Sequence, residues 1–530
     1  MRDSGILLLT LNVSEDGVNP PTTTFPSVVS FPMTLLWYDL ETFGRNPRFD
    51  RISQFAAVRT DDKFKILDEP VVLYGKLSPD YLPDPLACLI TGITPQEANE
   101  KGLNEAELIR AIDTHLARPG TCALGFNTIA FDDEFIRNLY YRNFHDPYRR
   151  EWADKNSRWD ILNLARAARD LRPEGINWPV TEEGKSSVRL ELLTKANDLS
   201  HEHAHDALSD VYATIAVARL IYEKQPKLFE WAFSYRTKDK VRTLIDLAER
   251  TPIVHTASSY YSDKGNTTLV CPLVTDPERR NVIHCFDLRF DPEPLLTLQV
   301  EEIRHRLFTS KKELEAEGLE RIPLTGIAIN KSPFLAPRNV MTDEAAGRLG
   351  IDVTQAMKHW ETLRRDTGLV AKLRKVFSEK HNWGNIDDPD LQIYERFFPD
   401  EDKKVLEVIK NTKPEELNQL RLNARDPRLP EMLRRYIGRN YPEVLDEEGR
   451  KRWKTFCASR ILFPPIPDVS DLGEYRKRLA AWRESGDLEA EKKPIIKALE
   501  EYGDYLEKEI LSGELPVSEP APEDLPASDG

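Results

Sequence analysis

Apolar and polar positions alternate in short runs over the first part of the chain, and segments with helical spacing separate these runs. The strand-like runs are LLWYDLETF (35–43), ISQFAAVRT (52–60), PVVLYGKL (70–77) and CALGFN (122–127). The segments with helical spacing are 105–117, 131–143, 157–170, 188–198 and 204–222. Strands that alternate with helices predict an α/β domain over residues 34–225, in which helices cover a sheet.

The pattern changes after residue 225. Four short β-rich runs follow, TPIVHTAS (251–258), TTLVCPLV (267–274), NVIHCFDL (281–288) and LTGIAIN (324–330). With the helices and turns between them, they predict a second, α+β domain over residues 226–382. Residues 383–510 have helical spacing nearly throughout, which predicts an all-helical third domain.

Both ends of the chain differ from these domains. Residues 1–33 are rich in Pro, Thr and Ser and hold one short apolar patch, ILLLTL. The patch is too short and too poorly flanked for a signal peptide, so we expect either a disordered arm or a true start at Met33. Residues 511–530 are acidic and rich in Pro, which predicts a disordered tail.

The composition is that of an ordinary soluble globular protein, with 40% hydrophobic and 31% charged residues. No apolar run approaches the roughly 20 residues that cross a bilayer, so we expect no membrane contact. The five cysteines are far apart and form no C-x-x-C pair. This spacing fits a reducing cytoplasm and argues against disulfides and a zinc site.

The net charge of −15 at first disfavours a nucleic-acid partner. However, residues 137–172 are locally basic and carry interleaved aromatic rings. The basic residues of this stretch are Arg137, Arg142, Arg149, Arg150, Lys155, Arg158, Arg166, Arg169 and Arg172. Such a composition is typical of a groove that binds a single strand, but also of two amphipathic helices with core rings and solvated arginines.

The strand-like stretch WYDLETFG (37–44) holds two carboxylates, Asp39 and Glu41. Side chains alternate along a strand, so both point to one face and repel each other. A divalent cation such as Mg²⁺ would relieve this repulsion, because hard cations take carboxylate oxygens. The alternative is a solvated surface pair, which is common in a chain this charged.

Two further acidic sites lie in the same domain. GFNTIAFDDEFIRN (125–138) runs from a strand into a helix and places Asp132 or Asp133 at the helix start, where a carboxylate is commonly an N-cap. HAHDALSDVYAT (203–214) begins a helix with His205 and Asp210 five residues apart. Alone, such a histidine is more often a surface residue than a catalyst.

The three sites occur in the order of the DEDDh family of 3′→5′ exonucleases, which the chain therefore resembles. The resemblance implies a ribonuclease H-like fold with a two-metal cradle. The residues that match the catalytic set of that family are Asp39, Glu41, Asp132, His205 and Asp210. Within it, the resemblance assigns the metal ions to Asp39, Glu41 and Asp210, while Asp132 completes the cradle partly through water.

Longer stretches resemble the bacterial exonuclease I family. They are YDLETFG, LITGITPQEA, FDDE-x-x-RN-x-x-YRNF-x-DPY, NSRWD, LRPEGINWP, RLE-x-LTKAN and AHDA-x-x-DVYATIA, followed more thinly by INKSPFLAP and EAAGRLGI. This resemblance implies that 226–382 is an SH3-like domain and 383–510 the helical C-terminal domain. The N-terminal arm and acidic tail depart from the family pattern.

The resemblance also implies a function. A processive 3′→5′ exonuclease would degrade single-stranded DNA to nucleoside 5′-monophosphates with two Mg²⁺ ions, for which Mn²⁺ may substitute, in bacterial DNA repair and recombination. The expected substrate contacts are Glu41, Arg137, Arg166, Arg172 and Arg189. The expected state is a cytoplasmic monomer. Basic residues near Arg172 and in the second domain would receive the acidic C-terminal tail of single-stranded DNA-binding protein.

Two other functions stay open at this stage. A DEDDh ribonuclease or proofreading subunit would resemble residues 37–225, but such proteins usually lack the 300 residues that follow. A catalytically inactive binding or scaffold protein is the other alternative. Its expected sign is the loss of a metal carboxylate, and all five matching positions are intact.

Overall fold

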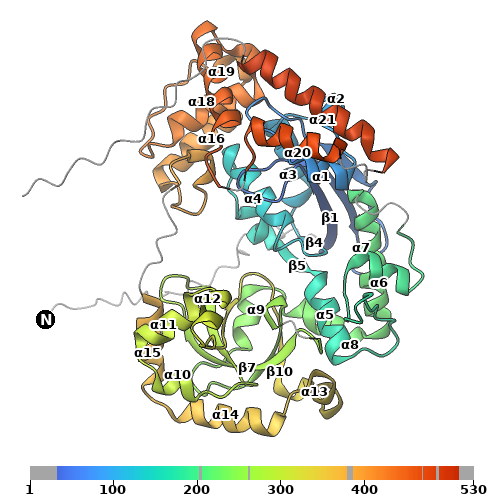
Figure 1. The fold of residues 1–530 in the computed structure, drawn as a ribbon, viewed down its shortest axis with the longest axis vertical. Helices are drawn as coiled ribbons and strands as arrows, with labels where there is room; N and C mark the ends of the chain where they lie inside the picture. The colour runs from blue at the N-terminus through green and yellow to red at the C-terminus, as the bar shows by residue number, and fades with distance from the viewer. Residues whose placement is uncertain are drawn as a thin grey trace, which may run out of the picture. The chain divides into compact units, whose positions relative to one another are not determined.

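The computed structural model describes residues 33–201, 206–260, 263–378, 386–467, 469–484 and 489–511 (Figure 1). The predicted arm and acidic tail lie outside these ranges except for Met33 and Leu511, so their predictions stay untested. All five cysteines are buried, and none forms a disulfide. Within the described ranges, every helix is too short or too polar to pass through a bilayer.

The first sheet has the strand order β3-β2-β1-β4-β5. Its strands are β1 Thr34–Thr42, β2 Ile52–Thr60, β3 Val71–Tyr74, β4 Thr121–Gly125 and β5 Ser157–Asp160. β1 is central, because it pairs antiparallel with β2 and parallel with β4. The strand with the two carboxylates is therefore the middle of a mixed sheet.

Helices cover both faces of this sheet. On one face lie α3 Glu105–Leu116 and α4 Asp132–Arg142, and on the other lie α5 Ile161–Leu171 and α7 Ala207–Lys224. The other helices up to residue 243 are α1 Pro85–Thr91, α2 Pro95–Lys101, α6 Leu190–Ala196, α8 Pro226–Ser234 and α9 Lys238–Thr243. Of these, α8 and α9 follow residue 225, and Val241 of α9 packs with the core of the second domain. The predicted helices are confirmed except at residues 157–160, which form β5. These residues pair with β4, and local periodicity cannot reveal a pairing with a strand more than 30 residues away. Asp160 then caps α5 by accepting a hydrogen bond from the Leu162 N–H at 2.9 Å.

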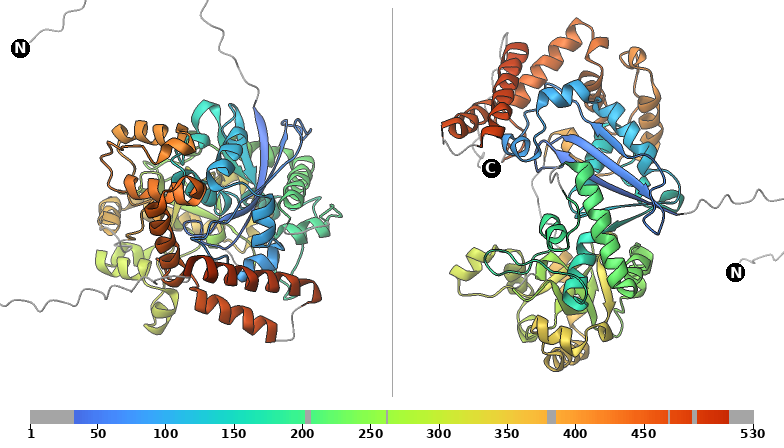
Figure 2. Two further views of the ribbon diagram at one scale, coloured as in Figure 1. Left: turned by 90° about the horizontal axis from the view of Figure 1, so that it is seen from above. Right: turned by 90° about the vertical axis from the view of Figure 1, so that its right-hand side faces the viewer.

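Alternation along β1 assigns its side chains to two separate cores. Leu36, Tyr38 and Leu40 pack with α3 and α4 on one face. Leu35 and Trp37 pack with α5 and α7 on the other. Figure 2 shows α7, drawn in green, running across the blue strands β1 and β2. Residues 39 and 41 continue the series 35 and 37, so they face α7.

The second sheet is antiparallel, with the strand order β10-β6-β7-β8-β9. Its strands are β6 Ile253–Thr256, β7 Thr267–Thr275, β8 Val282–Asp287, β9 Leu324–Ala328 and β10 Phe334–Pro337. Its helices are α10 Glu293–Thr297, α11 Val300–Phe308, α12 Lys311–Ala316, α13 Asp343–Leu349, α14 Val353–Arg365 and α15 Leu369–Ser378. The four predicted β-rich runs are confirmed as β6 to β9. The sequence did not predict β10, because four residues that end in proline give no strand signal.

The described residues after 386 form helices and no strand, as predicted. The helices are α16 Lys403–Asn411, α17 Pro414–Leu417, α18 Leu429–Asn440, α19 Glu447–Leu462, α20 Leu472–Glu484 and α21 Lys493–Leu506. α20 and α21 lie side by side (Figure 2) and pack on α1 and α2 of the first domain. The third domain thus shares a core with the first.

A buried ion-pair network also joins these two domains. Arg439 of α18 lies 2.9 Å from Asp80 of the first domain and 2.9 Å from Asp390. Each of the three side chains is at most 3% exposed. A buried charge without a partner lowers stability, so the first domain needs Arg439 to neutralise Asp80, and Arg439 needs the two aspartates.

Glu105 belongs to the same network, where it accepts a hydrogen bond from Arg142 at 2.7 Å and forms an ion pair with Arg51 at 3.3 Å. Burial by itself would raise the pKa of Glu105, but Arg142, Arg51 and Arg439 lower it from the ordinary 4.5 to about 2. Folding therefore favours the ionised carboxylate. Its contribution to stability is complete above pH 4.5 and is lost as the pH falls through about 2.

Arg439→Met is expected to lower the free energy of unfolding by about 3–5 kcal/mol, because Asp80 and Asp390 lose their shared partner. Urea unfolding at pH 7, followed by circular dichroism, measures this change. The matched control is Arg434→Met on the same helix, where Arg434 is exposed and pairs with Glu431 at the surface. The control should change stability by less than about 0.5 kcal/mol. Equal effects of the two substitutions would contradict a role for the buried network.

Candidate active site

Three carboxylates from two elements meet beside the first sheet. Asp39 and Glu41 extend from β1, and Asp210 lies in the first turn of α7. One oxygen of each carboxylate lies within 4.8 Å of the others. The structure therefore brings together the three residues that the sequence predicted to hold metal ions.

Gln54 fixes the start of α7 against the sheet next to this cluster. It lies opposite Glu41 on β2, and its Oε1 accepts a hydrogen bond from the Ala207 N–H at 3.1 Å. Asp206 caps the same helix and accepts from the Ser209 N–H at 3.3 Å. Asp210 follows one turn later, so its position depends on both contacts.

The two aspartates at the start of α4 have different surroundings. Asp132 accepts a hydrogen bond from the Leu40 N–H at 3.0 Å, between the two carboxylates of β1. Asp133 instead lies 2.5 Å from Arg158 and also pairs with Arg150. The sequence left open whether Asp132 or Asp133 joins the site, and Asp132 is the one that contacts β1 between Asp39 and Glu41. Asp132 is not one of the three carboxylates whose oxygens lie within 4.8 Å of one another.

Burial and mutual repulsion make the ionised form of these carboxylates unfavourable. Burial, followed by Asp39, Asp210 and Asp206, raises the pKa of Glu41 to about 9. Burial and then the charges of Asp132, Asp210 and Asp206 also raise the pKa of Asp39 well above its ordinary value. Close, hard oxygen donors with unfavourable mutual repulsion fit a divalent cation. The site thus supports a divalent metal.

The predicted role of His205 stays a prediction, and a second histidine approaches the carboxylate cluster. His205, the predicted catalytic histidine, lies outside the described residues. His201 is described, and its Nε2 lies 2.5 Å from Asp210 Oδ1. The sequence analysis did not select His201. The available signal was the segment HEHAH (201–205), in which three histidines precede Asp210.

The predicted substrate arginines differ in accessibility. Arg137 is buried and pairs with Glu134 at 2.6 Å and Glu151 at 2.7 Å, so its position does not support contact with a strand. The side chain of Arg189 is 72% exposed to solvent, and its guanidinium lies 3.6 Å from Glu191.

The other two predicted arginines are half-buried. Arg166 donates to Asn163 at 3.0 Å, within α5. Arg172 donates to the Val340 carbonyl at 3.2 Å and so reaches the second domain. Both keep part of the side chain at the surface, which is compatible with a contact to a ligand.

The basic stretch 137–172 matches neither of its two predicted forms. Its rings Tyr140, Tyr141, Phe144 and Trp159 are core residues, as the helical alternative expected. Most of its arginines, however, are buried in ion pairs rather than solvated or free for a phosphate, as Arg142 with Glu105 illustrates. Local composition could not show this burial, because it depends on how the segments pack, although several acidic partners such as Glu134 and Glu151 are close in the sequence.

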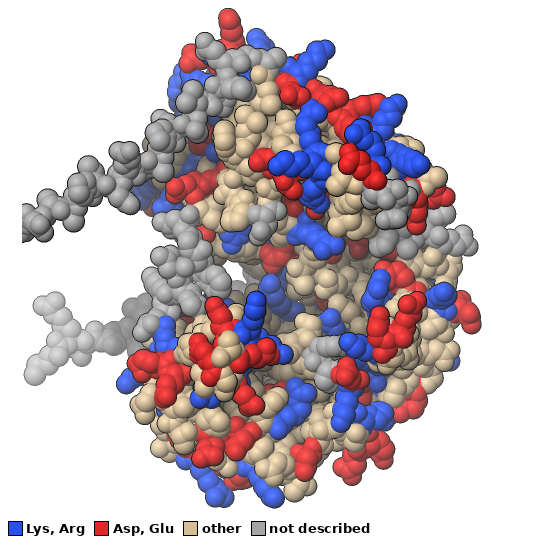
Figure 3. All heavy atoms as spheres, in the orientation of Figure 1, with Lys and Arg blue, Asp and Glu red and all other residues tan. Residues whose placement is uncertain are grey.

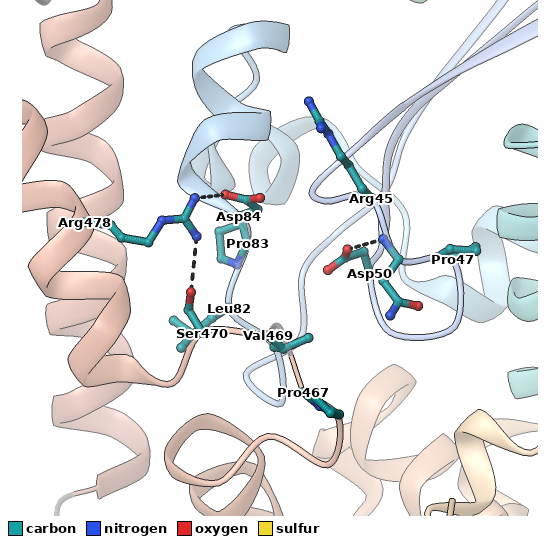
Figure 4. A pocket seen from close by; sticks show the side chains of 11 residues that line it. Arg45, Pro47, Asp50, Leu82, Pro83, Asp84, Pro467, Val469, Ser470 and Arg478 are labelled. Carbon is teal, nitrogen blue, oxygen red and sulfur yellow. Dashed lines mark hydrogen bonds and ion pairs between the residues drawn. The ribbon is translucent and has the colours of Figure 1, made fainter. Parts of the chain in front are cut away.

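Two grooves lie away from the carboxylates. One of about 560 Å³ separates the loop after β1 from the segment before α20, where Arg478 pairs with Asp84 at 2.7 Å (Figure 4). None of the predicted site residues lines it. The other, of about 740 Å³, lies in the second domain and is lined in part by Arg280, Phe308 and Lys331.

Comparison with known protein families covers most of the chain. Residues 36–218 match a family described as exonuclease. Residues 236–379 match the exonuclease I SH3-like domain, and residues 387–506 match the exonuclease I C-terminal domain. Exodeoxyribonuclease I of Escherichia coli is 42% identical over 473 residues, which span 89% of this chain and 98% of that relative.

The chain belongs to the exonuclease I family.

Other relatives agree with this family. The exodeoxyribonuclease I of Haemophilus influenzae is 40% identical over 88% of this chain and 97% of its own length. Exonuclease I from Methylocaldum szegediense has a TM-score of 0.85 at 44% identity and covers 89% of this chain and 99% of its own. A zinc-bound complex of E. coli exonuclease I with single-stranded DNA has a TM-score of 0.84 at 42% identity, covering 90% of this chain and 100% of its own.

The comparisons confirm the resemblance and the fold class. The chain is an exonuclease with a ribonuclease H-like domain, an SH3-like domain and a helical C-terminal domain. An oligoribonuclease of Marinobacter nauticus is 27% identical over 32% of the chain, which is less than the first domain alone.

Asp39→Asn is expected to raise the thermal unfolding midpoint of the metal-free protein, because the fold disfavours an ionised carboxylate at this position and asparagine is neutral. The expected result is a higher midpoint than that of the wild type in the same chelator. Thermal denaturation in chelator measures it, and added Mn²⁺ should then stabilise the variant less than the wild type. Asp62→Asn, at an exposed turn, is the control. A lower midpoint in chelator would count against repulsion within the cluster.

Proposed function

We propose that the chain is a processive 3′→5′ exonuclease that degrades single-stranded DNA to nucleoside 5′-monophosphates. The observation that carries this proposal is the cluster of Asp39, Glu41 and Asp210 in an exonuclease I chain. The relatives named exodeoxyribonuclease I and the complex with single-stranded DNA support the substrate. A ribonuclease is less well supported, because the match to the oligoribonuclease covers only 32% of this chain.

Asp39, Glu41 and Asp210 would hold two Mg²⁺ ions, with Asp132 completing the cradle and Mn²⁺ as a substitute. When bound, such ions neutralise charge on the phosphate and on the leaving oxygen. Carboxylate and water ligands suit Mg²⁺ better than softer metals. On the family resemblance, Glu41 would also contact the terminal nucleotide.

His205 is proposed as the general base. It would take one proton from the attacking water, whose oxygen forms a new bond to the 3′-terminal phosphorus. The bond from phosphorus to the 3′-oxygen of the preceding nucleotide breaks, and that oxygen gains a proton. The products are a nucleoside 5′-monophosphate and a strand with a new 3′-hydroxyl. An ordinary histidine pKa near 6.5 suits this role at neutral pH.

The strand would approach over Arg189, with Arg166 and Arg172 as further contacts. On the face shown in Figure 3, basic and acidic side chains are interspersed, so the net charge of −15 forms no uniform acidic surface there. This distribution leaves room for local phosphate contacts. We also propose that Arg172 and the second domain bind the acidic tail of single-stranded DNA-binding protein, and that the enzyme acts as a monomer in bacterial DNA repair and recombination in the cytoplasm.

Processivity would come from the second and third domains, which both reach the start of α4. Glu134 accepts from Lys331 of the second domain at 3.2 Å and from the Tyr394 hydroxyl of the third. The same helix begins with Asp132. Both later domains are thus fastened next to the proposed active site, where they would retain the strand between successive cleavages.

Asp210→Ala is expected to abolish cleavage of 5′-labelled single-stranded DNA in Mg²⁺ while it leaves strand binding largely intact, because the carboxylate holds metal rather than DNA. His205→Ala should lose about 10²–10⁴ in rate, the usual contribution of a general base. Gel assays of cleavage and anisotropy measurements of binding separate the two effects. Near wild-type cleavage by Asp210→Ala at saturating Mg²⁺ would rule out the site.

Glu134→Gln is expected to shorten processive runs, because it weakens the contacts of Lys331 and Tyr394 together. The measurement sizes products on long strands after excess unlabelled DNA is added as a trap, while cleavage of short oligonucleotides should change less than twofold. Removing residues 226–530 is a poorer test, because Asp80 would lose its buried partner Arg439.

Two comparisons sharpen the test of Glu134. Adding Lys331→Met and Tyr394→Phe to Glu134→Gln should shorten runs no further, because the three groups act as one unit. Tyr505→Phe, at an exposed tyrosine of α21, is the control and should leave run length unchanged. Wild-type run length in Glu134→Gln would mean that this contact does not retain the strand.

A further inference from the structure

His201 lies in the segment between α6 and α7 and is buried, with 5% of its side chain exposed. Its two ring nitrogens face opposite partners. Nε2 lies 2.5 Å from Asp210 Oδ1, and Nδ1 lies 3.3 Å from Thr194 Oγ1. The ring therefore bridges α6 and the first turn of α7.

Thr194 is itself held in place. Its side chain is buried, and its hydroxyl lies 3.0 Å from the carbonyl oxygens of Leu190 and Glu191 in its own helix. The imidazole thus rests against a fixed group on one side and contacts a carboxylate of the proposed metal site on the other. Such an arrangement limits rotation of both the ring and the carboxylate.

The hydrogen-bond pattern defines what His201 does. Asp210 belongs to a cluster of carboxylates whose shared negative charge favours a donor, so Nε2 carries the proton and donates to Oδ1. A nitrogen that donates has no lone pair for a proton from water, and Nδ1 faces Thr194. The ring consequently acts through Asp210 and not on the reacting atoms.

We propose that His201 is a positioning residue that orients Asp210 for a divalent cation. The inference rests on the proposed role of Asp210 as a metal ligand. The imidazole offsets part of the repulsion that Asp39 and Glu41 exert on the Asp210 carboxylate, which is 20% exposed, so its removal would leave that carboxylate less firmly oriented. Donors behind metal ligands commonly change metal affinity 10- to 100-fold.

The test is direct titration of the full-length protein with Mn²⁺ in the absence of DNA, followed by electron paramagnetic resonance of the free ion. His201→Ala is expected to weaken Mn²⁺ binding about 10- to 100-fold. His201→Gln should restore most of the affinity, because its amide N–H can reach the place of Nε2. Cleavage by His201→Ala should recover toward the wild-type rate as Mn²⁺ is raised.

Two further variants separate the possible failures. His305→Ala removes an exposed histidine that also contacts a carboxylate, Glu317, and should leave the isotherm unchanged. Asp210→Ala should lose the binding step, and a wild-type isotherm in that variant would overturn the metal site and the role of His201 together. If Asp210→Ala loses binding but His201→Ala does not, only the positioning role is overturned. A cleavage defect in His201→Ala that persists at saturating Mn²⁺, with an unchanged isotherm, would make His201 a proton acceptor instead.

Discussion

Repulsion among closely placed, partly buried carboxylates is the constraint on which the first domain depends. Asp39, Glu41 and Asp210 approach one another closely although each would be more stable apart. The surrounding fold supplies the force that holds them. β1 is fixed by neighbours on both sides, and Gln54 ties the start of α7 to β2. The repulsion lowers the folding stability, but it leaves the three carboxylates already positioned for a cation.

The opposite balance holds between the first and third domains. Asp80, Glu105 and Asp390 are also buried, but arginines from both domains surround them. Arginines neutralise the charges of Asp80, Glu105 and Asp390 within the protein. The carboxylates of the candidate active site instead repel one another, and a bound cation would relieve that repulsion. The contrast separates carboxylates that hold the fold together, which arginines neutralise, from carboxylates of the candidate active site, which repel one another.

Sequence reasoning succeeded where the signal was local. Alternation in WYDLETFG placed Asp39 and Glu41 on one face, and the helical spacing of 204–222 placed Asp210 on a helix, while only the family resemblance grouped Asp210 with the other two. It failed where partners are distant. β5 was taken for helix because its pairing is with β4. The burial of Arg137 in ion pairs with Glu134 and Glu151 could not be predicted either, because burial depends on how the elements pack. His201 was passed over because its contact with Asp210 arises only once α6 and α7 are packed.

The buried arginines of the domain interface have a consequence for how the molecule responds to its surroundings. A guanidinium stays charged at any working pH, and ion pairs sealed from water are little affected by dissolved salt. Contacts between a protein surface and DNA phosphates, in contrast, weaken steeply as salt concentration rises. Arg439 therefore keeps the third domain in place under conditions that strip nucleic acid from the surface. Rising salt concentration would therefore weaken the proposed contacts with single-stranded DNA while the first and third domains stay packed on each other.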